Sequence, residues 1–475
     1  MKLYEQLCNE LSSRIQQGYY QAGDKLPSIR MMSQEHGVSI STVQEAYRLL
    51  EANGLAESRP KSGYYVQRKT ASPTLPEISR PVQRPLEVSQ WELVLELLDS
   101  HEREGLVALG RGMPDVSATT LKPLLKILSD LNRHSDLRSL SYDNLRGSDE
   151  LRLQIARLCV DSGCRLHPDD IVVTTGCQEA LSCSMRVVTQ PGDVVAVDSP
   201  SFYGSMQTIK ALGLKALEIP THPETGVSLE ALELALEQWP VKAIQVTPIC
   251  NNPLGYTMPD DRKQRLLALA QQYDLPIIED DIYGDLAYQY PRPRTIKSYD
   301  DDGRVMLCSS VSKTLAPGLR VGWVAPGRYG DLLLHMKYVS TASTATLPQR
   351  AVAEFIAQGG YERHLRKMRA QYQRGRDRMI EWIERYFPTA TRISYPQGGF
   401  LLWVELPEGF DSVKLNKKLL QLGIGIAPGV LFSASGKYRN CFRINYTDVA
   451  GDEVQSAVKI IGEQAAKMLK ESSPQ

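Results

Sequence analysis

One lysine, Lys313, lies in an apolar, hydroxyl-rich segment, residues 308–326, CSSVSKTLAPGLRVGWVAP. No acidic residue lies within five positions of it, and a second cation, Arg320, follows seven positions later. A lysine amine forms a Schiff base with an aldehyde, and nearby positive charge lowers its pKa and increases the fraction of free amine. Arginine binds phosphate through paired hydrogen bonds. The segment therefore predicts a reactive amine beside an anion-binding site.

Pyridoxal 5′-phosphate would use both features, because it carries an aldehyde and a phosphate, and other segments offer the further groups that it needs. The segment IIEDDIY, 277–283, has acids for the pyridine nitrogen and a tyrosine for the phenolic oxygen. PICNNPLGY, 248–256, adds amide donors, and DSPSFYG, 198–204, an aromatic ring. TTGCQEAL, 174–181, predicts a strand-to-helix turn whose backbone amides bind phosphate.

Composition narrows the classes of protein. The 475 residues carry 55 basic and 55 acidic side chains, which disfavours a wholly basic nucleic-acid binder. Eight cysteines show no C-x-x-C pair and seven histidines no paired spacing, so we expect no metal site. The first residues lack the apolar core of a signal peptide, and no apolar run approaches the ~18 residues of a membrane span. We expect a soluble, cytoplasmic protein.

The chain divides into three parts of unequal length. Residues 1–68 form a compact block, and residues 69–88, with four prolines, predict a semi-rigid, exposed linker. In residues 89–475, short β-branched runs alternate with helical patterns, which predicts an α/β fold with a mainly parallel sheet and helices on both faces. Ligands bind at the edge where the strands of such a sheet end. Within residues 89–475, a large α/β part covers about 100–340, and a smaller α+β part covers about 341–475.

The first block has the pattern of a DNA-binding fold. Apolar residues recur at helical spacing over 3–15, and two further helices are joined by the tight turn HGVS, 36–39. LAESRPKSGYYVQ, 55–67, predicts two short strands with a basic tip. The block resembles the GntR-type winged helix, because LPSIR, the GVS, TV, AY, LE and GL positions and SGYYV all occur at that family's spacing.

The GntR resemblance implies contacts with double-stranded DNA. The second helix of the helix-turn-helix enters the major groove, where an amide such as that of Gln44 pairs with an adenine edge. The implied DNA-binding residues are Arg30, Ser39, Ser41, Thr42, Gln44, Lys61 and Gly63. The alternative is a small helical interaction domain whose polar residues form a solvated face.

The five segments of residues 174–326 occur in the order found in fold-type I, class I/II aminotransferases, and the resemblance extends over about residues 100–460. It implies that Lys313 is the lysine that holds the cofactor aldehyde and later moves a proton. Asp280 would bind the pyridine nitrogen, and Tyr283 with Asn252 the phenolic oxygen. The implied phosphate contacts are Gly176, Cys177, Gln178, Ser310, Ser312 and Arg320.

The same resemblance assigns the rest of the site. Phe202 would stack on the cofactor ring, with the adjacent Tyr203 as an alternative. Arg443, helped by Asn252 and the backbone near Gly112, would hold the α-carboxylate of an amino acid. Tyr142 resembles the tyrosine that such enzymes lend to the phosphate of a neighbouring subunit, which implies a homodimer.

Together, the winged helix, the linker and the aminotransferase-like part resemble the MocR subfamily of bacterial regulators. The resemblance implies a transcription factor that carries pyridoxal 5′-phosphate and senses the cofactor, an amine or an amino acid through Schiff-base chemistry. A catalytically active amino acid aminotransferase with an appended DNA-binding domain is the alternative, and a sensor of the cofactor level alone is a third hypothesis.

Overall fold

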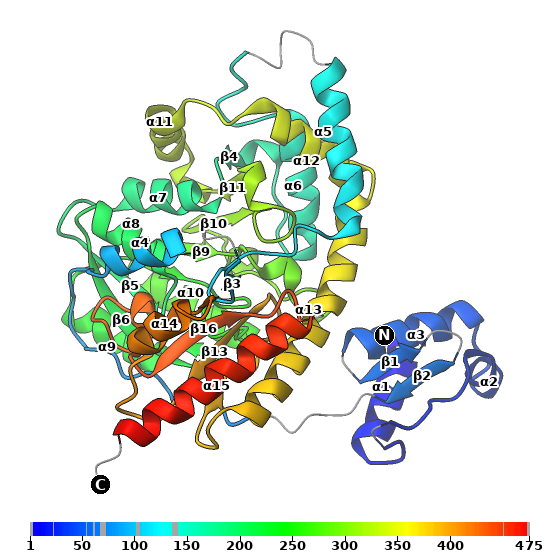
Figure 1. Ribbon diagram of the computed structural model, residues 1–475. Helices are drawn as coiled ribbons and strands as arrows, with labels where there is room; N and C mark the ends of the chain where they lie inside the picture. The colour runs from blue at the N-terminus through cyan, green and yellow to red at the C-terminus, as the bar shows by residue number, and fades with distance from the viewer. Residues whose placement is uncertain are drawn as a thin grey trace. The chain divides into compact units, whose positions relative to one another are not determined.

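The computed structural model describes residues 3–21, 23–53, 55–59, 62–66, 73–100, 105–134, 141–449 and 451–472. It consists of two compact units, Met1–Pro73 with Tyr288–Pro291, and Thr74–Ala287 with Arg292–Gln475. Figure 1 shows the elements of both units.

The small unit packs three helices against a two-stranded antiparallel hairpin. The elements are α1 (Leu3–Gln16), α2 (Ile29–Glu35), α3 (Ile40–Ala52), β1 (Ala56–Arg59) and β2 (Gly63–Val66). Ser28 and Ser39 begin α2 and α3, because each side chain accepts a hydrogen bond from the backbone N–H three residues later. The core includes Leu7, Leu11, Met32, Val43, Tyr47 and Leu50. The predicted winged helix-turn-helix is confirmed.

An eight-stranded sheet forms the centre of the large unit, in the order β4-β11-β10-β9-β8-β5-β6-β7. The strands are β4 (Val172–Thr174), β5 (Val194–Ser199), β6 (Lys215–His222), β7 (Gly226–Val227), β8 (Val241–Val246), β9 (Ile277–Asp280), β10 (Val305–Ser310) and β11 (Gly322–Ala325). The strands from β10 to β6 run parallel, while β11 and β7 are antiparallel to their neighbours. The predicted mainly parallel sheet is confirmed.

Helices cover both faces of this sheet because its strands are apolar on both sides. Along β5, Val194 and Ala196 join the core under α9 (Leu229–Gln238) and α10 (Asp260–Gln272). Val195 and Val197 join the core under α7 (Cys177–Val188) and α8 (Tyr203–Ala211). The alternation follows from the two-residue period of a strand.

A smaller α+β part follows, with the antiparallel sheet β12-β13-β16-β15. Its strands are β12 (Arg392–Ile393), β13 (Leu401–Glu405), β15 (Ala427–Pro428) and β16 (Cys441–Asn445). The long helix α13 (Gly360–Tyr386) lies beside α15 (Asp452–Ser472), as Figure 1 shows. The remaining elements of the large unit are α4 (Trp91–Ser100), β3 (Val107–Ala108), α5 (Lys122–His134), α6 (Asp149–Asp161), α11 (Gly330–Thr341), α12 (Thr346–Ala357), α14 (Ser412–Leu420) and β14 (Ile424–Gly425).

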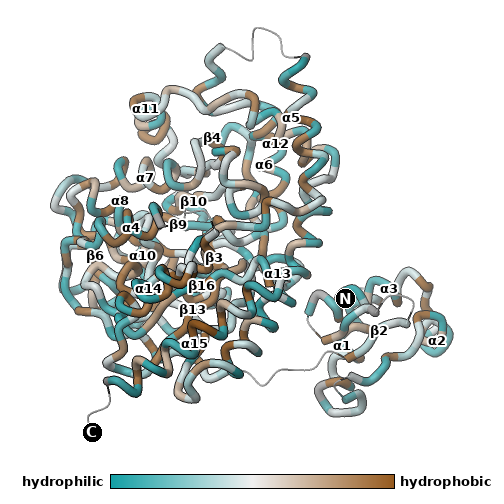
Figure 2. The backbone as a smooth tube through the Cα atoms, in the orientation of Figure 1, coloured by the Kyte–Doolittle hydropathy of each residue, from teal (hydrophilic) through white to brown (hydrophobic). Residues whose placement is uncertain are grey.

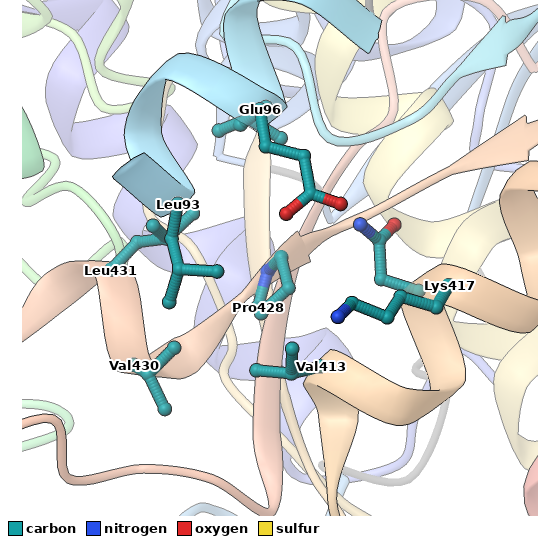
Figure 3. Close-up of a pocket in the computed structure, with 9 residues that line it drawn as sticks. Leu93, Glu96, Val413, Lys417, Pro428, Val430 and Leu431 are labelled. Atoms are coloured by element: carbon teal, nitrogen blue, oxygen red, sulfur yellow. The ribbon is translucent and has the colours of Figure 1, made fainter. Parts of the chain in front are cut away.

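Helix α4 packs beside α14 and the turn after β15. Figure 3 shows the labelled residues that line the crevice between them, namely Leu93, Glu96, Val413, Lys417, Pro428, Val430 and Leu431. The crevice holds about 10 Å³ of space for water, which is about one molecule. It is a packing contact that anchors α4, and it has no room for a larger ligand.

The segment expected as an exposed linker differs in the structure. Residues 74–88, here called the strap, bind along the large unit, whereas residues 69–72 lie outside the described residues. Leu86 and Ala216 exchange two backbone hydrogen bonds of 2.9 Å, and Ser79 Oγ accepts one from Thr221 N at 2.7 Å. The short β7 leaves the edge of β6 unpaired at Ala216, and the strap satisfies those groups. The strap is therefore fixed to the large unit by hydrogen bonds, while side chains such as Ile78, which is 52 % exposed, still face solvent.

Hydropathy follows the layers, with hydrophobic residues in the central strands and hydrophilic ones on the outer helices (Figure 2). In the described part of the chain, no helix combines the length and the apolar character needed to cross a membrane. The eight cysteines are buried and free. Within the same residues, no cluster of three or more His, Cys, Asp or Glu side chains is arranged to hold a metal ion.

Candidate functional site

Four predicted segments meet at the carboxyl edge of the large sheet. Asp280 ends β9, Lys313 follows β10, Gly176 follows β4 and Phe202 follows β5. They line a cavity with about 140 Å³ of space that water can enter. Its lining residues are Cys177, Gln178, Leu181, Phe202, Asn252, Asp280, Ile282, Tyr283, Ser312, Lys313, Pro317 and Arg320. Parallel strands bring these distant segments together, since their carboxyl ends share one edge.

Lys313 lies at the centre of this cavity. Its Nζ donates a hydrogen bond of 2.6 Å to the carbonyl oxygen of Gly112. A Cβ placed on Gly112 would lie 3.7 Å from both Lys313 Nζ and Arg443 Nη2 and 4.0 Å from the Tyr283 hydroxyl, so these groups surround one point. Burial and the charge of Arg443 lower the pKa of Lys313 to about 8, against the opposing effect of Asp280. A substantial fraction of the amine is therefore free near pH 8.

Asp280 is a buried carboxylate that forms no ion pair within the described residues. Its Oδ1 accepts hydrogen bonds from Ile282 N at 3.2 Å and from the Cys177 thiol at 3.5 Å. Burial raises the pKa of Asp280 to about 6, because these two neutral donors do not fully replace water around the charge. A protonated pyridine nitrogen at this carboxylate would supply the missing cation.

The hydroxyl of Tyr283 is buried and has no hydrogen-bond partner among the described residues. Asn252 also lines the cavity, and its Oδ1 accepts a hydrogen bond of 2.9 Å from Arg443 Nη1. Because Oδ1 is the atom bonded to Arg443, the NH₂ group of Asn252 is left as a donor with no partner among the described residues. The unsatisfied Tyr283 hydroxyl and the uncompensated Asp280 therefore fit the phenolic oxygen and the ring nitrogen of pyridoxal phosphate.

The turn of residues 174–178, here called the Gly176 turn, opens helix α7 at one end of the cavity. Gly176 has φ of +81°, and a Cβ there would lie 2.5 Å from Arg320 Nη2, so only glycine fits. Arg320 Nη2 donates to Thr175 O at 2.8 Å. Ser312 Oγ is buried without a partner among the described residues, facing the same cavity. Amide, hydroxyl and guanidinium donors thus converge as an anion site.

Two predicted phosphate residues are placed differently from their neighbours. The side chain of Gln178 donates to Gly204 O at 3.0 Å and Thr208 Oγ1 at 2.8 Å, so both N–H groups of its amide are already engaged. Ser310 Oγ accepts a hydrogen bond from Ser312 N at 3.2 Å and does not line the cavity. Ser310 thus holds the loop that presents Ser312 and Lys313.

Arg443 is the buried cation of the smaller part. Its side chain comes from β16, donates to Asn252 and to Gly110 O at 2.7 Å, and forms no ion pair within the described residues. Its guanidinium lies 5.0 Å from the ring centre of Phe432 and 5.7 Å from that of Tyr203. Phe202 lines the cavity, whereas Tyr203 packs under Arg443. A buried cation with only neutral partners suits a carboxylate ligand.

Tyr142 does not lie at this cavity. Its side chain is 89 % exposed, in a shallow groove formed with Ser343–Pro348.

Leu181, Ile282 and Pro317 line the cavity and were not predicted. Ile282 and Pro317 lie within four residues of predicted ones, but nothing about their residue types indicates a site.

The described residues among the predicted DNA contacts lie on α2, on α3 with its cap, and at the start of β2. Arg30, Ser41 and Gln44 are exposed, and Ser39 caps α3 through a 3.1 Å hydrogen bond from Thr42 N. Gly63 has φ of +111° at the start of β2, while Lys61 lies outside the described residues. Lys25 was not among the predicted DNA-contact residues. It lies beside β2, because its Nζ is 5.9 Å from the ring centre of Tyr65. The two residues are 40 positions apart in the sequence, so no local pattern indicates that they are neighbours.

The fold and the site define a protein with a winged-helix DNA-binding domain joined to an aminotransferase-type domain. Family models match both parts: aminotransferase class I and II over residues 104–461, and bacterial regulatory proteins, gntR family, over residues 3–66. The chain belongs to the aminotransferase class I and II family and, with its GntR domain, to the MocR subfamily of regulators.

Individual relatives agree with this assignment. The chain is 53 % identical over 463 residues to the uncharacterized HTH-type transcriptional regulator YjiR of Escherichia coli, covering 98 % of each chain. The solved kynurenine aminotransferase of Pyrococcus horikoshii is 31 % identical, with a TM-score of 0.74 over 79 % of this chain and 95 % of its own. LysN of Thermus thermophilus, an α-aminoadipate aminotransferase solved with N-(5′-phosphopyridoxyl)-L-leucine, is 26 % identical, with the same TM-score and coverage.

Proposed function

We propose that this protein is a transcriptional regulator that binds an operator in double-stranded DNA and holds pyridoxal 5′-phosphate, through which it senses an amine or amino acid. The observation that carries the proposal is a single chain that joins a winged helix to a domain whose cavity is lined by Lys313 and Asp280, with Arg443 beside Lys313 at Gly112. The name of YjiR and the phosphopyridoxyl ligand of LysN support it.

Each side chain of the cavity has a task that its surroundings favour. When bound, pyridoxal phosphate supplies an aldehyde that reacts with amines and a ring that withdraws electrons. Lys313, partly unprotonated near pH 8, serves as nucleophile and proton carrier. Asp280 would hold the ring nitrogen, and Tyr283 and the NH₂ group of Asn252 would donate to the phenolic oxygen. Phe202 would pack against the ring.

The phosphate is held at the Gly176 turn. The donors are the backbone amides of Gly176, Cys177 and Gln178 at the start of α7, the hydroxyl of Ser312 and the guanidinium of Arg320. Ser310 supports Ser312 through its 3.2 Å hydrogen bond. Tyr142, exposed and distant from this cavity, reaches the phosphate of a second copy in a homodimer.

Arg443 gives the site its preference for an effector with a carboxylate. Its contacts with Asn252 and Gly110, beside Gly112, orient the guanidinium toward Lys313. An amino acid would place its carboxylate on Arg443 and its amine near Lys313. The winged helix would read the operator through Gln44 and Ser41, with Arg30, Ser39, Thr42, Lys61 and Gly63 near the backbone and grooves.

The test uses the full chain. Visible absorbance, borohydride reduction and mass spectrometry should locate the cofactor on Lys313 in the wild type and not in Lys313→Ala. A DNA sequence that the protein binds should then be selected from a random-sequence pool. The affinity of the protein for this DNA should change when amines or amino acids are added, with a coupling free energy of about 1–3 kcal/mol between the two sites. The proposal is contradicted if the protein binds no cofactor, or if its affinity for DNA is the same with and without every ligand tested.

The second candidate is an amino acid aminotransferase with an appended domain. It is favoured by the completeness of the site, in which Lys313 and Asp280 line the cavity and Arg443 lies beside Lys313 at Gly112. Many turnovers of amino acid to keto acid, with no effect of the substrate on DNA affinity, would support this candidate instead. A sensor of cofactor level alone would respond to pyridoxal phosphate and to no amine.

A further inference from the structure

A fully buried lysine lies behind the candidate site without lining its cavity. Lys337, on α11, has a side chain that is 1 % exposed. Its Nζ donates to Glu179 Oε2 at 3.1 Å, to Thr341 Oγ1 at 2.6 Å and to Thr344 Oγ1 at 2.8 Å. Three acceptor residues surround the ammonium, and the second oxygen of Glu179, Oε1, also lies 3.3 Å away, so the buried charge is both paired and hydrogen-bonded.

The partner of this lysine, Glu179, directly follows the Gly176 turn and is hydrogen-bonded to it. Glu179 is the third residue of α7, and its Oε2 accepts a hydrogen bond of 2.5 Å from Thr175 N, just before Gly176. Burial alone would raise the pKa of Glu179, but bonds from Thr175 and Thr341 and the charge of Lys337 outweigh it and hold the pKa below its usual value. The carboxylate is therefore a negative charge in the first turn of α7.

That negative charge creates a conflict with the proposed phosphate. The start of α7 attracts anions through its free N–H groups and helix dipole, and a phosphate there would be repelled by an uncompensated carboxylate nearby. Lys337 neutralises Glu179 through contacts of 3.3 and 3.1 Å between its Nζ and the two carboxylate oxygens. The site can then keep Glu179 as an acceptor for Thr175 without losing its attraction for phosphate.

The same ammonium also fixes a second turn. Thr344, which Lys337 holds, donates to Val173 O at 3.3 Å, and its own carbonyl accepts from Gln349 Nε2 at 2.8 Å. Gln349 Oε1 accepts from Ser148 N at 2.9 Å, in the loop that follows Tyr142. One buried network thus joins the Gly176 turn to the loop 141–148.

We infer that Lys337 is a positioning residue for the cofactor phosphate. Lys337 acts by neutralising Glu179 and by fixing the Gly176 turn. The inference rests on the proposed pyridoxal phosphate site. It goes beyond that proposal by assigning phosphate selectivity to an ion pair that does not touch the cavity. The consequence is a preference for pyridoxal phosphate over pyridoxal, the same aldehyde without its phosphate.

The test compares the affinities of the full chain for these two aldehydes, by absorbance titration. Lys337→Met should weaken binding of pyridoxal phosphate at least tenfold and leave pyridoxal within about twofold of the wild type. Lys337→Arg should recover much of the preference, since it keeps the charge. The matched control is Lys263→Met, which removes another buried lysine, held by Asp260 Oδ1 at 3.0 Å and Arg294 O at 2.6 Å, and should leave the preference unchanged.

Glu179→Gln provides a second variant that keeps an acceptor for Thr175 and removes the negative charge. It should raise the preference for pyridoxal phosphate, and it should restore the preference when combined with Lys337→Met. An unchanged preference in Lys337→Met, an equal loss of both aldehydes, or a fall in Glu179→Gln overturns the inference.

The wild type separates this inference from the proposed function. If it binds neither aldehyde at Lys313, the proposed function is refuted and the inference with it. If it binds pyridoxal phosphate at Lys313 while Lys337→Met keeps the same preference, only the inference is refuted.

Discussion

Arg443 donates a 2.9 Å hydrogen bond from Nη1 to Oδ1 of Asn252, across 191 residues of sequence. The arginine comes from β16 in the smaller part, and the asparagine follows β8 in the large part. The contact places the proposed carboxylate-binding residue beside the residue that would face the cofactor's phenolic oxygen. Binding at one of these groups therefore changes the surroundings of the other.

Replacing Arg443 should separate the response to amino acids from cofactor binding. Arg443→Met removes the only proposed carboxylate contact with a formal charge, so the concentration of an amino acid that changes DNA affinity should rise at least tenfold. Occupancy of pyridoxal phosphate should remain close to that of the wild type. The measurement is fluorescence anisotropy of the selected DNA. Amines without a carboxylate are the control, and an equal loss of their effect would contradict the assignment.

Lys313 should give the cofactor-free protein a pH-dependent reaction with pyridoxal phosphate. Because its pKa is lowered to about 8, the amine is protonated below that pH, and the rate of adduct formation should rise through pH 8 to a plateau. Stopped-flow absorbance measures this profile. Arg443→Met should move the midpoint upward, since the charge of Arg443 is the second largest cause of the shift after burial. A midpoint near that of a free lysine would contradict the predicted surroundings.

Asp280→Asn should weaken the binding of the cofactor and should stabilise the folded, cofactor-free chain. The pKa of Asp280 is raised from 3.8 to about 6, so its charged form costs folding free energy above pH 6, a cost that disappears as pH falls toward 4. The variant should be more stable at pH 8 by about 2–3 kcal/mol and equal near pH 4. Its affinity for pyridoxal phosphate should fall at least tenfold.

The neighbouring Asp281 is the control for this substitution. Arg292 Nη2 donates to both oxygens of Asp281, at 2.7 and 2.6 Å, and Asp281→Asn leaves that buried arginine with one carboxylate fewer. Asp281→Asn should therefore lower stability, as urea unfolding would show. If Asp280→Asn also lowers stability at pH 8, the burial cost assigned to Asp280 is wrong.

Local sequence predicted most of the cavity, because residue type and position after a strand are both visible in short segments. Asp280 ends a strand of the predicted sheet, Lys313 and Gly176 follow strands, and parallel strands bring such positions together. Phe202 and Tyr203 could not be separated, since they are adjacent at the start of α8 and only packing decides which faces the cavity. The Lys337–Glu179 pair spans 158 residues and gives no local signal. The strap depends on an unpaired edge of β6, which no pattern within residues 69–88 reveals.

Gln44→Ala should reduce specific DNA binding without affecting the cofactor. Gln44 is exposed in the first turns of α3, where we propose that its amide reads a base edge, so the loss should be about 1–3 kcal/mol on the selected DNA and much smaller on random DNA. Gln34→Ala, at an exposed position of α2, is the matched control and should have little effect. Equal losses on both DNAs would show that Gln44 contacts the backbone.

Release of the strap from the large unit should uncouple ligand binding from DNA binding. Leu86→Pro removes the donor of the 2.9 Å bond to Ala216 O, so residues 74–88 should become more sensitive to limited proteolysis, while cofactor binding at Lys313 persists. Because the strap precedes the aminotransferase-type part and follows the winged helix in the chain, its release should also reduce the effect of ligands on DNA affinity. Gln83→Pro is the control, since its N–H makes no backbone hydrogen bond within the described residues. Increased proteolysis with an intact ligand response would show that the signal does not pass through the strap.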